Sequence, residues 1–268
     1  MDRASRTAER VAERRAAHQL LDKPVVFDDP LALAIVGRDA ALRDPSPLDP
    51  YLRAAFAARS RFAEDELGEA YRRGIRQYVV LGAGFDTFAY RNPFAGLRVF
   101  EVDHPATQAV KRARLDRAGI RIPDDVVFVP VDFATTSLAD ALDIRGPAFF
   151  SWLGVVPYLE RDAIEATLRY VASLPAGTAI VFDYGTSPAS LSLVGRIVFD
   201  RMAKRVAAAG EPWKTFFAPE ELAAMLRACG FSQVENWGPA ELNARYFAGR
   251  ADGLRIGEMM QIAKAATG

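Results

Sequence analysis

The chain alternates short apolar runs with stretches of helical periodicity from Gln77 onward, and this alternation constrains the fold more than any other feature. The apolar runs are QYVVLG, LRVFEVD, VVFVPVD, PAFFSWL, TAIVFDY and SQVENW. Between them lie helical stretches such as PATQAVKRARLDRAG, RDAIEATLRYVASL and PEELAAMLRACG, each with a proline or glycine at a boundary. Strands that alternate with helices form a parallel sheet covered on both faces. We therefore predict an α/β protein with a doubly wound sheet.

Two helices are predicted before the first apolar run, over residues 3–21 and 51–73, from apolar residues at three- and four-residue steps. Residues 28–50 carry DDP, RDPSP and LDP, which favour turns, and are expected to be connecting structure. Each helix places an arginine, Arg15 or Arg59, on its apolar side. A guanidinium cannot lose its charge, so each needs an anionic partner unless its end reaches water. That partner is either a bound ligand or a protein carboxylate.

The segment 186–217 is longer than an ordinary connection, and its apolar positions predict an inserted helix that could cover a substrate. We find no repeat or linker, so a single domain over 1–268 is expected. Its predicted parts are an N-terminal helical part (1–75), a cofactor-binding core (76–185), a helical lid insert before the sixth strand (186–217) and a C-terminal completion of the sheet (218–268).

The net charge limits the possible partners, because the chain has 34 Lys and Arg residues and also 34 Asp and Glu residues. A chain without net charge lacks the field that holds a polyanion, so neither nucleic acid nor membrane is expected as a partner. The single cysteine, Cys229, and the absence of an apolar leader favour a cytoplasmic location. No group of residues has metal-ligand spacing, and His18 is expected to be solvated. The expected partner is a small molecule or a peptide, and the oligomeric state is unknown.

A glycine turn, Gly82–Gly84, follows the first apolar run in VVLGAGFDT. Without Cβ atoms, its two glycines let the backbone approach a ligand closely. Asp103 follows Gly84 by 19 residues, at the end of the next run. Glycines under a ligand and a carboxylate for ribose hydroxyls are typical of a nucleotide site. An ordinary strand-to-helix turn is the alternative.

The third run ends in Asp132-Phe133, an acid and an aromatic suited to an adenine amino group and ring. Asp132 could instead cap the next helix. The dinucleotide fingerprint wants glycine or alanine where Thr87 stands, so the pattern favours S-adenosylmethionine over a nicotinamide dinucleotide.

Together these segments resemble the leucine carboxyl methyltransferase-like family of class I S-adenosylmethionine-dependent methyltransferases, with Rossmann-like folds, and its bacterial O-methyltransferase branch. The segments that carry the resemblance are SRTAERVAERRA, DDPLA, RSRF, RQYVVLGAGFDTFAYR, FEVDHPATQAVKRARL, VPVDF and LNARYF. The resemblance implies that the glycine turn lines the methionine part of the cofactor, that Arg59 pairs with its carboxylate, and that Arg15 lies near the substrate. The expected cofactor-binding residues are Arg59, Gly82, Ala83, Gly84, Asp103, His104, Asp132 and Phe133, and the expected catalytic residues are Tyr158 and Arg15.

One segment departs from the family, which commonly has Trp-x-x-Glu-Gly-Leu-x-x-Tyr-Leu after the fourth strand. Here the chain reads SWLGVVPYL, and Leu153 stands where the glutamate would be. The contact made by that glutamate is therefore absent or supplied by another residue. Tyr158 still matches and could orient an acceptor oxygen, or it is a core aromatic.

The expected function is methyl transfer to an oxygen, with a carboxylate favoured as acceptor. An ionised carboxylate needs no general base, whereas a hydroxyl acceptor would require Tyr158 or His104 to serve as one. The alternatives are a NAD-dependent oxidoreductase and a cofactor-binding protein without activity.

Overall fold

The computed structural model describes residues 5–43, 46, 48–133 and 136–268, and these form a seven-stranded sheet. The strand order is β3-β2-β1-β4-β5-β7-β6. All neighbours are parallel except β7, which is antiparallel to both β5 and β6. The strands are β1 (Gln77–Leu81), β2 (Arg98–Asp103), β3 (Val126–Pro130), β4 (Phe149–Trp152), β5 (Ala179–Gly185), β6 (Gln233–Trp237) and β7 (Met260–Ala266).

The helices cover both faces of the sheet, as the doubly wound prediction requires. They are α1 (Arg6–Leu21), α2 (Pro30–Val36), α3 (Arg38–Ala41), α4 (Asp49–Arg72), α5 (Pro105–Arg117), α6 (Leu138–Ala141), α7 (Arg161–Ala172), α8 (Leu193–Ala208), α9 (Pro219–Cys229) and α10 (Pro239–Tyr246). In the described part of the chain, none of them is both long and apolar enough to cross a bilayer.

Successive side chains of β1 point to opposite faces and separate the two halves of the core. Tyr78 and Val80 pack in the cluster that contains the buried side of α4 and Leu242 of α10. Val79 and Leu81 pack in the cluster that contains α7 and α9. Because β1, β4 and β5 are buried on both faces, these central parallel strands read as continuous apolar runs, and the sequence marks them clearly.

The six predicted strands and the inserted helix before the sixth strand are confirmed, since α8 lies between β5 and β6. The seventh strand, β7, was not predicted. Its sequence MQIAKAA lacks the β-branched and aromatic density of the other strands. It enters the sheet as the antiparallel partner between β5 and β6.

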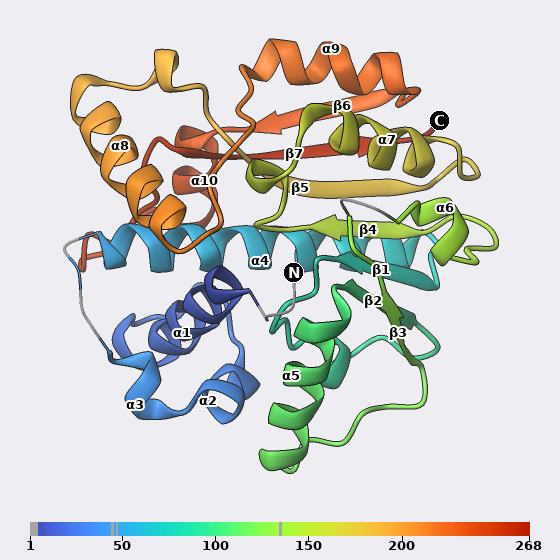
Figure 1. The fold of residues 1–268 in the computed structure, drawn as a ribbon, viewed down its shortest axis with the longest axis horizontal. Coiled ribbons are helices and arrows are strands. Elements are labelled where there is room, and N and C mark those ends of the chain that lie inside the picture. The colour runs from blue at the N-terminus through green and yellow to red at the C-terminus, as the bar shows by residue number, and fades with distance from the viewer. Residues whose placement is uncertain (1–4, 44–45, 47, 134–135) are drawn as a thin grey trace.

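The prediction that residues 28–50 are connecting structure is wrong for part of this segment, because it contains α2 and α3. Pro30 begins α2, where its missing N–H group costs no helical hydrogen bond. Small residues such as Ala32 and Ala41 then pack against Ala16 and Ala17 of α1. Figure 1 shows α1, α2 and α3 gathered on one side of α4, at the same end of the molecule as α8.

The prediction that His18 is solvated is also wrong, since the residue is fully buried. Its Nε2 accepts hydrogen bonds from the backbone N–H groups of Val26 and Phe27, at 3.0 and 3.3 Å. Its Nδ1 lies 2.8 Å from Asp22, to which it can then donate. His18 therefore ties the chain after α1 back onto that helix.

Candidate active site

The glycine turn lies at the carboxyl end of β1, in a backbone conformation that favours glycine. Gly82 and Gly84 have φ angles of 67° and 48°. A Cβ atom on Gly82 would collide with the side chain of Val155. The N–H groups of Gly82 and Ala83 donate to the carbonyl of Val102, at 2.8 and 3.0 Å, and hold the turn against β2.

Asp103 at the end of β2 is bound to this turn through its carboxylate. One oxygen accepts the N–H of Gly84 at 2.5 Å, and the other accepts the N–H of His104 at 2.6 Å. Burial raises the pKa of Asp103 above its ordinary value, although both N–H groups favour the charged form. The carboxylate still has lone pairs for further donors such as ribose hydroxyls.

A cavity of about 410 Å³ lies over the turn, and we call it the turn cavity. Its size suits a nucleoside-sized ligand. All ten residues that the sequence analysis assigned to the site line it: Arg15, Arg59, Gly82, Ala83, Gly84, Asp103, His104, Asp132, Phe133 and Tyr158. Lining a cavity brings these residues together but does not by itself assign their roles.

Arg59 has a protein partner, which answers one question that the sequence left open. Its Nη1 donates to Oδ2 of Asp183 on β5 at 2.8 Å, and both residues are buried. The other oxygen of Asp183 accepts the N–H of Gly154 at 2.6 Å. The guanidinium packs against Gly154, where a Cβ atom would lie 2.8 Å from Nη2. Arg59 therefore lines the turn cavity with its charge already balanced.

Arg15 also has protein carboxylates as partners. It forms an ion pair with Asp29 and a second with Asp86, the latter at 3.2 Å, and its Nη2 donates to Thr87 at 3.2 Å. Burial alone would lower the pKa of Arg15, but the two carboxylates outweigh it and raise that pKa. Arg15 thus holds α1 to the segment that follows the glycine turn.

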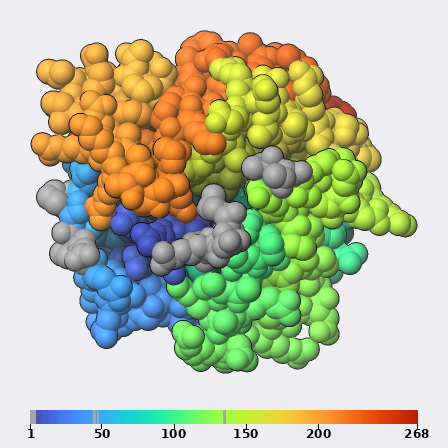
Figure 2. All heavy atoms as spheres, viewed as in Figure 1, coloured from blue at the N-terminus to red at the C-terminus, as the bar shows by residue number. Residues whose placement is uncertain are grey.

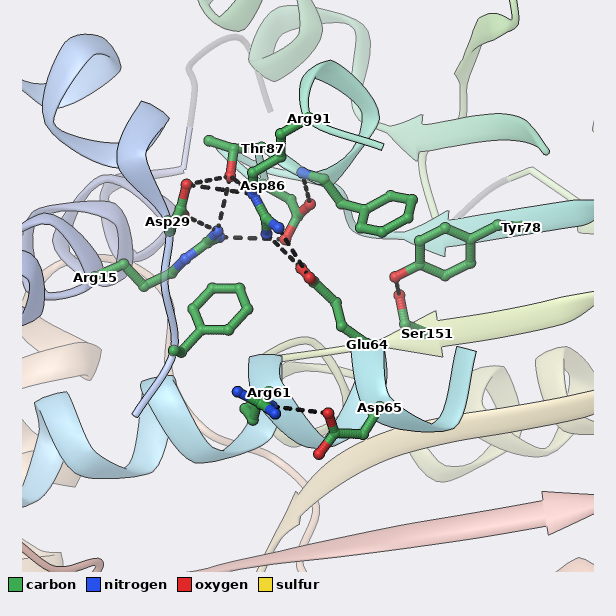
Figure 3. A network of polar contacts seen from close by, with 12 residues as sticks. Arg15, Asp29, Arg61, Glu64, Asp65, Tyr78, Asp86, Thr87, Arg91 and Ser151 are labelled. Atoms are coloured by element: carbon green, nitrogen blue, oxygen red, sulfur yellow. Dashed lines mark hydrogen bonds and ion pairs between the residues drawn. The ribbon is translucent and has the colours of Figure 1, made fainter. Parts of the chain in front are cut away.

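This contact belongs to a larger, partly buried network that Figure 3 shows, in which Arg91 makes the next ion pair. Arg91 donates to Thr87 at 3.2 Å and forms an ion pair with Glu64 of α4. Burial raises the pKa of Glu64 despite that partner. Asp86 differs, because although burial opposes its charge, Arg15, Lys111 and Arg91 lower its pKa. The network links α1, α4 and the glycine turn.

A second cavity, of about 210 Å³, adjoins the first, and we call it the apolar cavity. Three aromatic rings, Phe199, Trp213 and Phe216, form a cluster on it with centroids 5.0 to 6.1 Å apart. The sequence did not predict this cavity, because its lining runs from Thr7 to Met260. Figure 2 shows α1, in dark blue, recessed beneath the orange segment that contains α8.

Five residues line both cavities, and we call them the shared wall: Thr7, Val11, Arg59, Gly154 and Tyr158. Burial raises the pKa of the Tyr158 hydroxyl, and the side chains of Trp213 and Thr7 only partly oppose this. The phenol therefore keeps its proton at neutral pH and can donate a hydrogen bond.

Leu153, at the position of the family glutamate, lines the turn cavity as an apolar side chain. An acid from another strand does contact this segment, because Asp183 of β5 accepts the N–H of Gly154. The sequence did not point to Asp183, although it is an acid near the end of the fifth apolar run TAIVFDY, one residue before the last. Among the described residues, no group of three or more His, Cys, Asp or Glu side chains could hold a metal ion.

Comparison with known proteins agrees with this geometry. The model of the family described as leucine carboxyl methyltransferase matches residues 8–172. The "Putative S-adenosyl-L-methionine-dependent methyltransferase YktD" of Bacillus subtilis (strain 168) is 33% identical over 274 residues, covering 90% of this chain and 90% of that protein.

Two solved structures share the fold. A DUF574 family protein from Streptomyces avermitilis MA-4680 has a TM-score of 0.58 at 21% identity, covering 96% of this chain and 97% of its own. A "putative methyltransferase" from Thermobifida fusca YX also has a TM-score of 0.58, at 17% identity, covering 100% of this chain and 96% of its own.

These findings confirm the class I methyltransferase fold, the family resemblance and S-adenosylmethionine as the cofactor. They give the nicotinamide alternative no support. The chain belongs to the leucine carboxyl methyltransferase family of S-adenosylmethionine-dependent methyltransferases.

Proposed function

We propose that this protein transfers the methyl group of S-adenosylmethionine to a carboxylate oxygen of a small molecule or peptide bound in the apolar cavity. The turn cavity then holds the cofactor, and the transfer takes place at the shared wall. The nucleophilic oxygen forms a bond to the methyl carbon while the bond from that carbon to sulfur breaks.

The residues of the turn cavity fit the cofactor. When bound, S-adenosylmethionine supplies an electrophilic methyl group on a sulfonium sulfur. The two glycines leave backbone space for the methionine part, and Asp103 has lone pairs for the ribose hydroxyls. Phe133 offers a ring face for the adenine, beside Asp132. Arg59 would hold the cofactor carboxylate through the N–H groups that Asp183 does not use.

The observation that carries the proposal is the composition of the shared wall. Of its residues, Thr7, Val11 and Gly154 have no basic side chain, and Arg59 is a cation. Tyr158 keeps its proton because burial raises its pKa. A hydroxyl or ammonium acceptor would need a base at this point, whereas a carboxylate arrives ionised. The wall therefore favours an acceptor that needs only alignment.

We assign two roles to residues around the acceptor. Tyr158 donates a hydrogen bond that orients the acceptor oxygen, and Arg15 positions α1 through its carboxylate partners. Residues 186–217 act as a lid, because Phe199, Met202 and Val206 of α8 line the apolar cavity. A closed lid excludes water, which would otherwise solvate the carboxylate and weaken it as a nucleophile.

The proposal is tested with methyl-labelled S-adenosylmethionine and a panel of phenylalkanoic acids, each with its matched alcohol and amine. We expect the label in a methyl ester, which base hydrolyses. Label in a base-stable ether or in a methylamine would contradict the carboxylate assignment. Binding of the cofactor without transfer to any acceptor would support an inactive cofactor-binding protein.

Tyr158→Phe is the matched variant for the orienting role. We expect turnover to fall by roughly ten- to a hundredfold, because one donor aimed at the reacting oxygen is lost. Affinity for S-adenosylhomocysteine should stay unchanged. Tyr170→Phe is the control, since Tyr170 lies on α7 and lines neither cavity, and it should leave both quantities near the wild-type values.

A further inference from the structure

The walls and the charged residues of the apolar cavity indicate which class of ligand it can bind. Its floor and roof are apolar, from Phe56 of α4 to Phe199 and Met202 of α8. Thioether and aromatic side chains adapt well to flat or branched hydrocarbon bodies. The body of the ligand is therefore expected to be apolar.

Charged side chains on the apolar cavity fall into paired and unpaired groups. Arg59 is paired with Asp183, at 2.8 Å. Arg14 is paired with Asp49, to which its Nε and Nη2 donate at 3.0 and 2.9 Å. Asp183 is the one acid on the cavity among the described residues, and Arg59 already engages it. Asp183 and Asp49 therefore already balance these two cations, and the N–H groups of Arg59 that Asp183 does not use are the ones proposed for the cofactor carboxylate.

Arg10 of α1 differs, because in the part of the chain that the structure describes its guanidinium has no hydrogen bond or ion pair. It is half-buried and lines the apolar cavity only. It stands between Thr7 and Val11 on the same helix, and both belong to the shared wall. A partly desolvated guanidinium beside apolar walls is a site for a planar anion. Arg205 also lines the cavity, but its exposed side chain is solvated.

We infer that Arg10 recognises the carboxylate of an apolar acid and so decides that this site takes acids and releases esters. The inference rests on the proposed function and names the acceptor class for it. Arg10 lies on α1 three residues from Thr7, and Thr7 and Tyr158 both belong to the shared wall. An acid held by Arg10 therefore lies next to the residues that also line the turn cavity.

The reaction removes the charge on which this recognition depends. Transfer joins the methyl carbon to a carboxylate oxygen, breaks its bond to sulfur, and leaves a neutral ester and a neutral thioether. No proton is exchanged. Arg10 then faces an ester oxygen instead of an anion, so its contribution to binding falls once the product has formed. Substrate capture and product release therefore depend on the same residue.

Ligand-detected NMR on the full-length protein, saturated with S-adenosylhomocysteine, measures this selectivity without turnover. The probes are 4-phenylbutanoate, octanoate and their methyl esters. We expect the wild type to bind at least one acid roughly ten- to a hundredfold more tightly than its ester. Arg10→Gln should remove that preference by weakening the acid alone, and Arg10→Lys should restore part of it.

Two controls identify the residue. Arg6→Gln changes an exposed arginine one turn earlier on α1 that lines neither cavity, and should keep the wild-type preference. Arg205→Gln should change it by less than Arg10→Gln does. A wild type that binds no acid better than its ester, or a preference that survives in Arg10→Gln, would overturn the inference.

Failure of this inference and failure of the proposed function give different results. If carboxylates are methylated but Arg10→Gln keeps the acid preference, only the role of Arg10 is wrong. If the acids bind through Arg10 but carry no label after incubation with the methyl donor, the proposed reaction is wrong. Affinity for S-adenosylhomocysteine should be equal in Arg10→Gln and the wild type, and a loss there would place Arg10 in the cofactor site instead and overturn its assignment to the acceptor.

Discussion

The Nη1 atom of Arg59 lies 2.8 Å from Oδ2 of Asp183, and this buried pair sits where the two cavities meet. Asp183 is bound on its other oxygen by the N–H of Gly154. The pair joins α4 to β5 and holds the segment after β4, in which Gly154 and Tyr158 line both cavities. The Arg59–Asp183 pair therefore stabilises the fold and also holds the residues that line the two cavities in place.

Arg59→Met is expected to destabilise the fold, because it leaves the carboxylate of Asp183 buried without its cation. Losing one partner of a buried pair costs about 3–5 kcal/mol in the free energy of unfolding. The sequence left open whether the partner of Arg59 is a ligand or a protein carboxylate, and the bond to Asp183 is the reason for expecting a loss of stability. Chemical denaturation measures the difference.

The double variant Arg59→Met, Asp183→Asn separates stability from binding. It removes both charges but keeps an acceptor for Gly154, so most of the unfolding free energy should return. S-adenosylhomocysteine affinity should remain lower by about 1.5–3 kcal/mol, because its carboxylate has lost a charged donor. Adenosine lacks that carboxylate and should lose much less. Equal losses for both ligands would remove Arg59 from the carboxylate site.

Gly82→Ala is expected to disturb the glycine turn before any ligand is considered. Its Cβ would meet Val155, and the positive φ angle costs about 1–2 kcal/mol for a residue with a side chain. Adding Val155→Ala should relieve the collision and recover part of the melting temperature. If Gly82→Ala melts like the wild type, the turn is not held as described.

Asp103 should make cofactor binding depend on pH in the acid range. Its pKa in the free protein is raised by burial, while ribose hydroxyls donating to the carboxylate would lower the pKa in the complex. Affinity is therefore full above the free-protein pKa and falls as the pH drops through it. Asp103→Asn should bind S-adenosylhomocysteine about 1–3 kcal/mol more weakly and lose this acid limb. Calorimetry across this pH range measures both affinities. If the affinity of Asp103→Asn still falls at acid pH as the wild-type affinity does, the assignment of Asp103 is wrong.

His18→Leu should lower stability without touching the site. The change leaves the N–H groups of Val26 and Phe27 and the carboxylate of Asp22 with one partner fewer. Each stranded group costs about 1–3 kcal/mol. The folded fraction should still bind S-adenosylhomocysteine with the wild-type affinity, and a tenfold loss in that fraction would show that α1 transmits the change to the cavities.

The central parallel strands could be predicted from sequence because burial on both faces makes β1, β4 and β5 continuous apolar runs. The strand β7 was not predicted because it carries a charged residue, Lys264. The ammonium group of Lys264 pairs with Glu66 at 2.9 Å and Glu235 at 3.2 Å while its stem packs within the sheet. Likewise, the charged residues around His18 in the sequence led to the wrong expectation that its side chain is solvated. The partners of Lys264 are distant in sequence, whereas those of His18 lie 4, 8 and 9 residues away and meet it only because the chain after α1 folds back onto that helix.

The turn cavity could be predicted because the carboxyl ends of parallel strands meet at one edge, so Gly82, Asp103 and Asp132 had to be neighbours. The apolar cavity could not, since its walls come from α1, α4, α8 and β7, and no local pattern relates these elements. The same holds for the partners of Arg15 and Arg59, which lie 14 and 124 residues away in sequence.

The position of a selenium atom in a bound cofactor analogue tests whether methyl transfer takes place across the shared wall. In crystals with the selenium analogue of S-adenosylhomocysteine, anomalous scattering locates the selenium without reference to any assumed pose. We predict the selenium in the turn cavity, facing the shared wall beside Tyr158, with the ligand carboxylate at Arg59 and the ribose at Asp103. Selenium outside the turn cavity, or on its side remote from Tyr158 and Arg59, would contradict transfer across the shared wall.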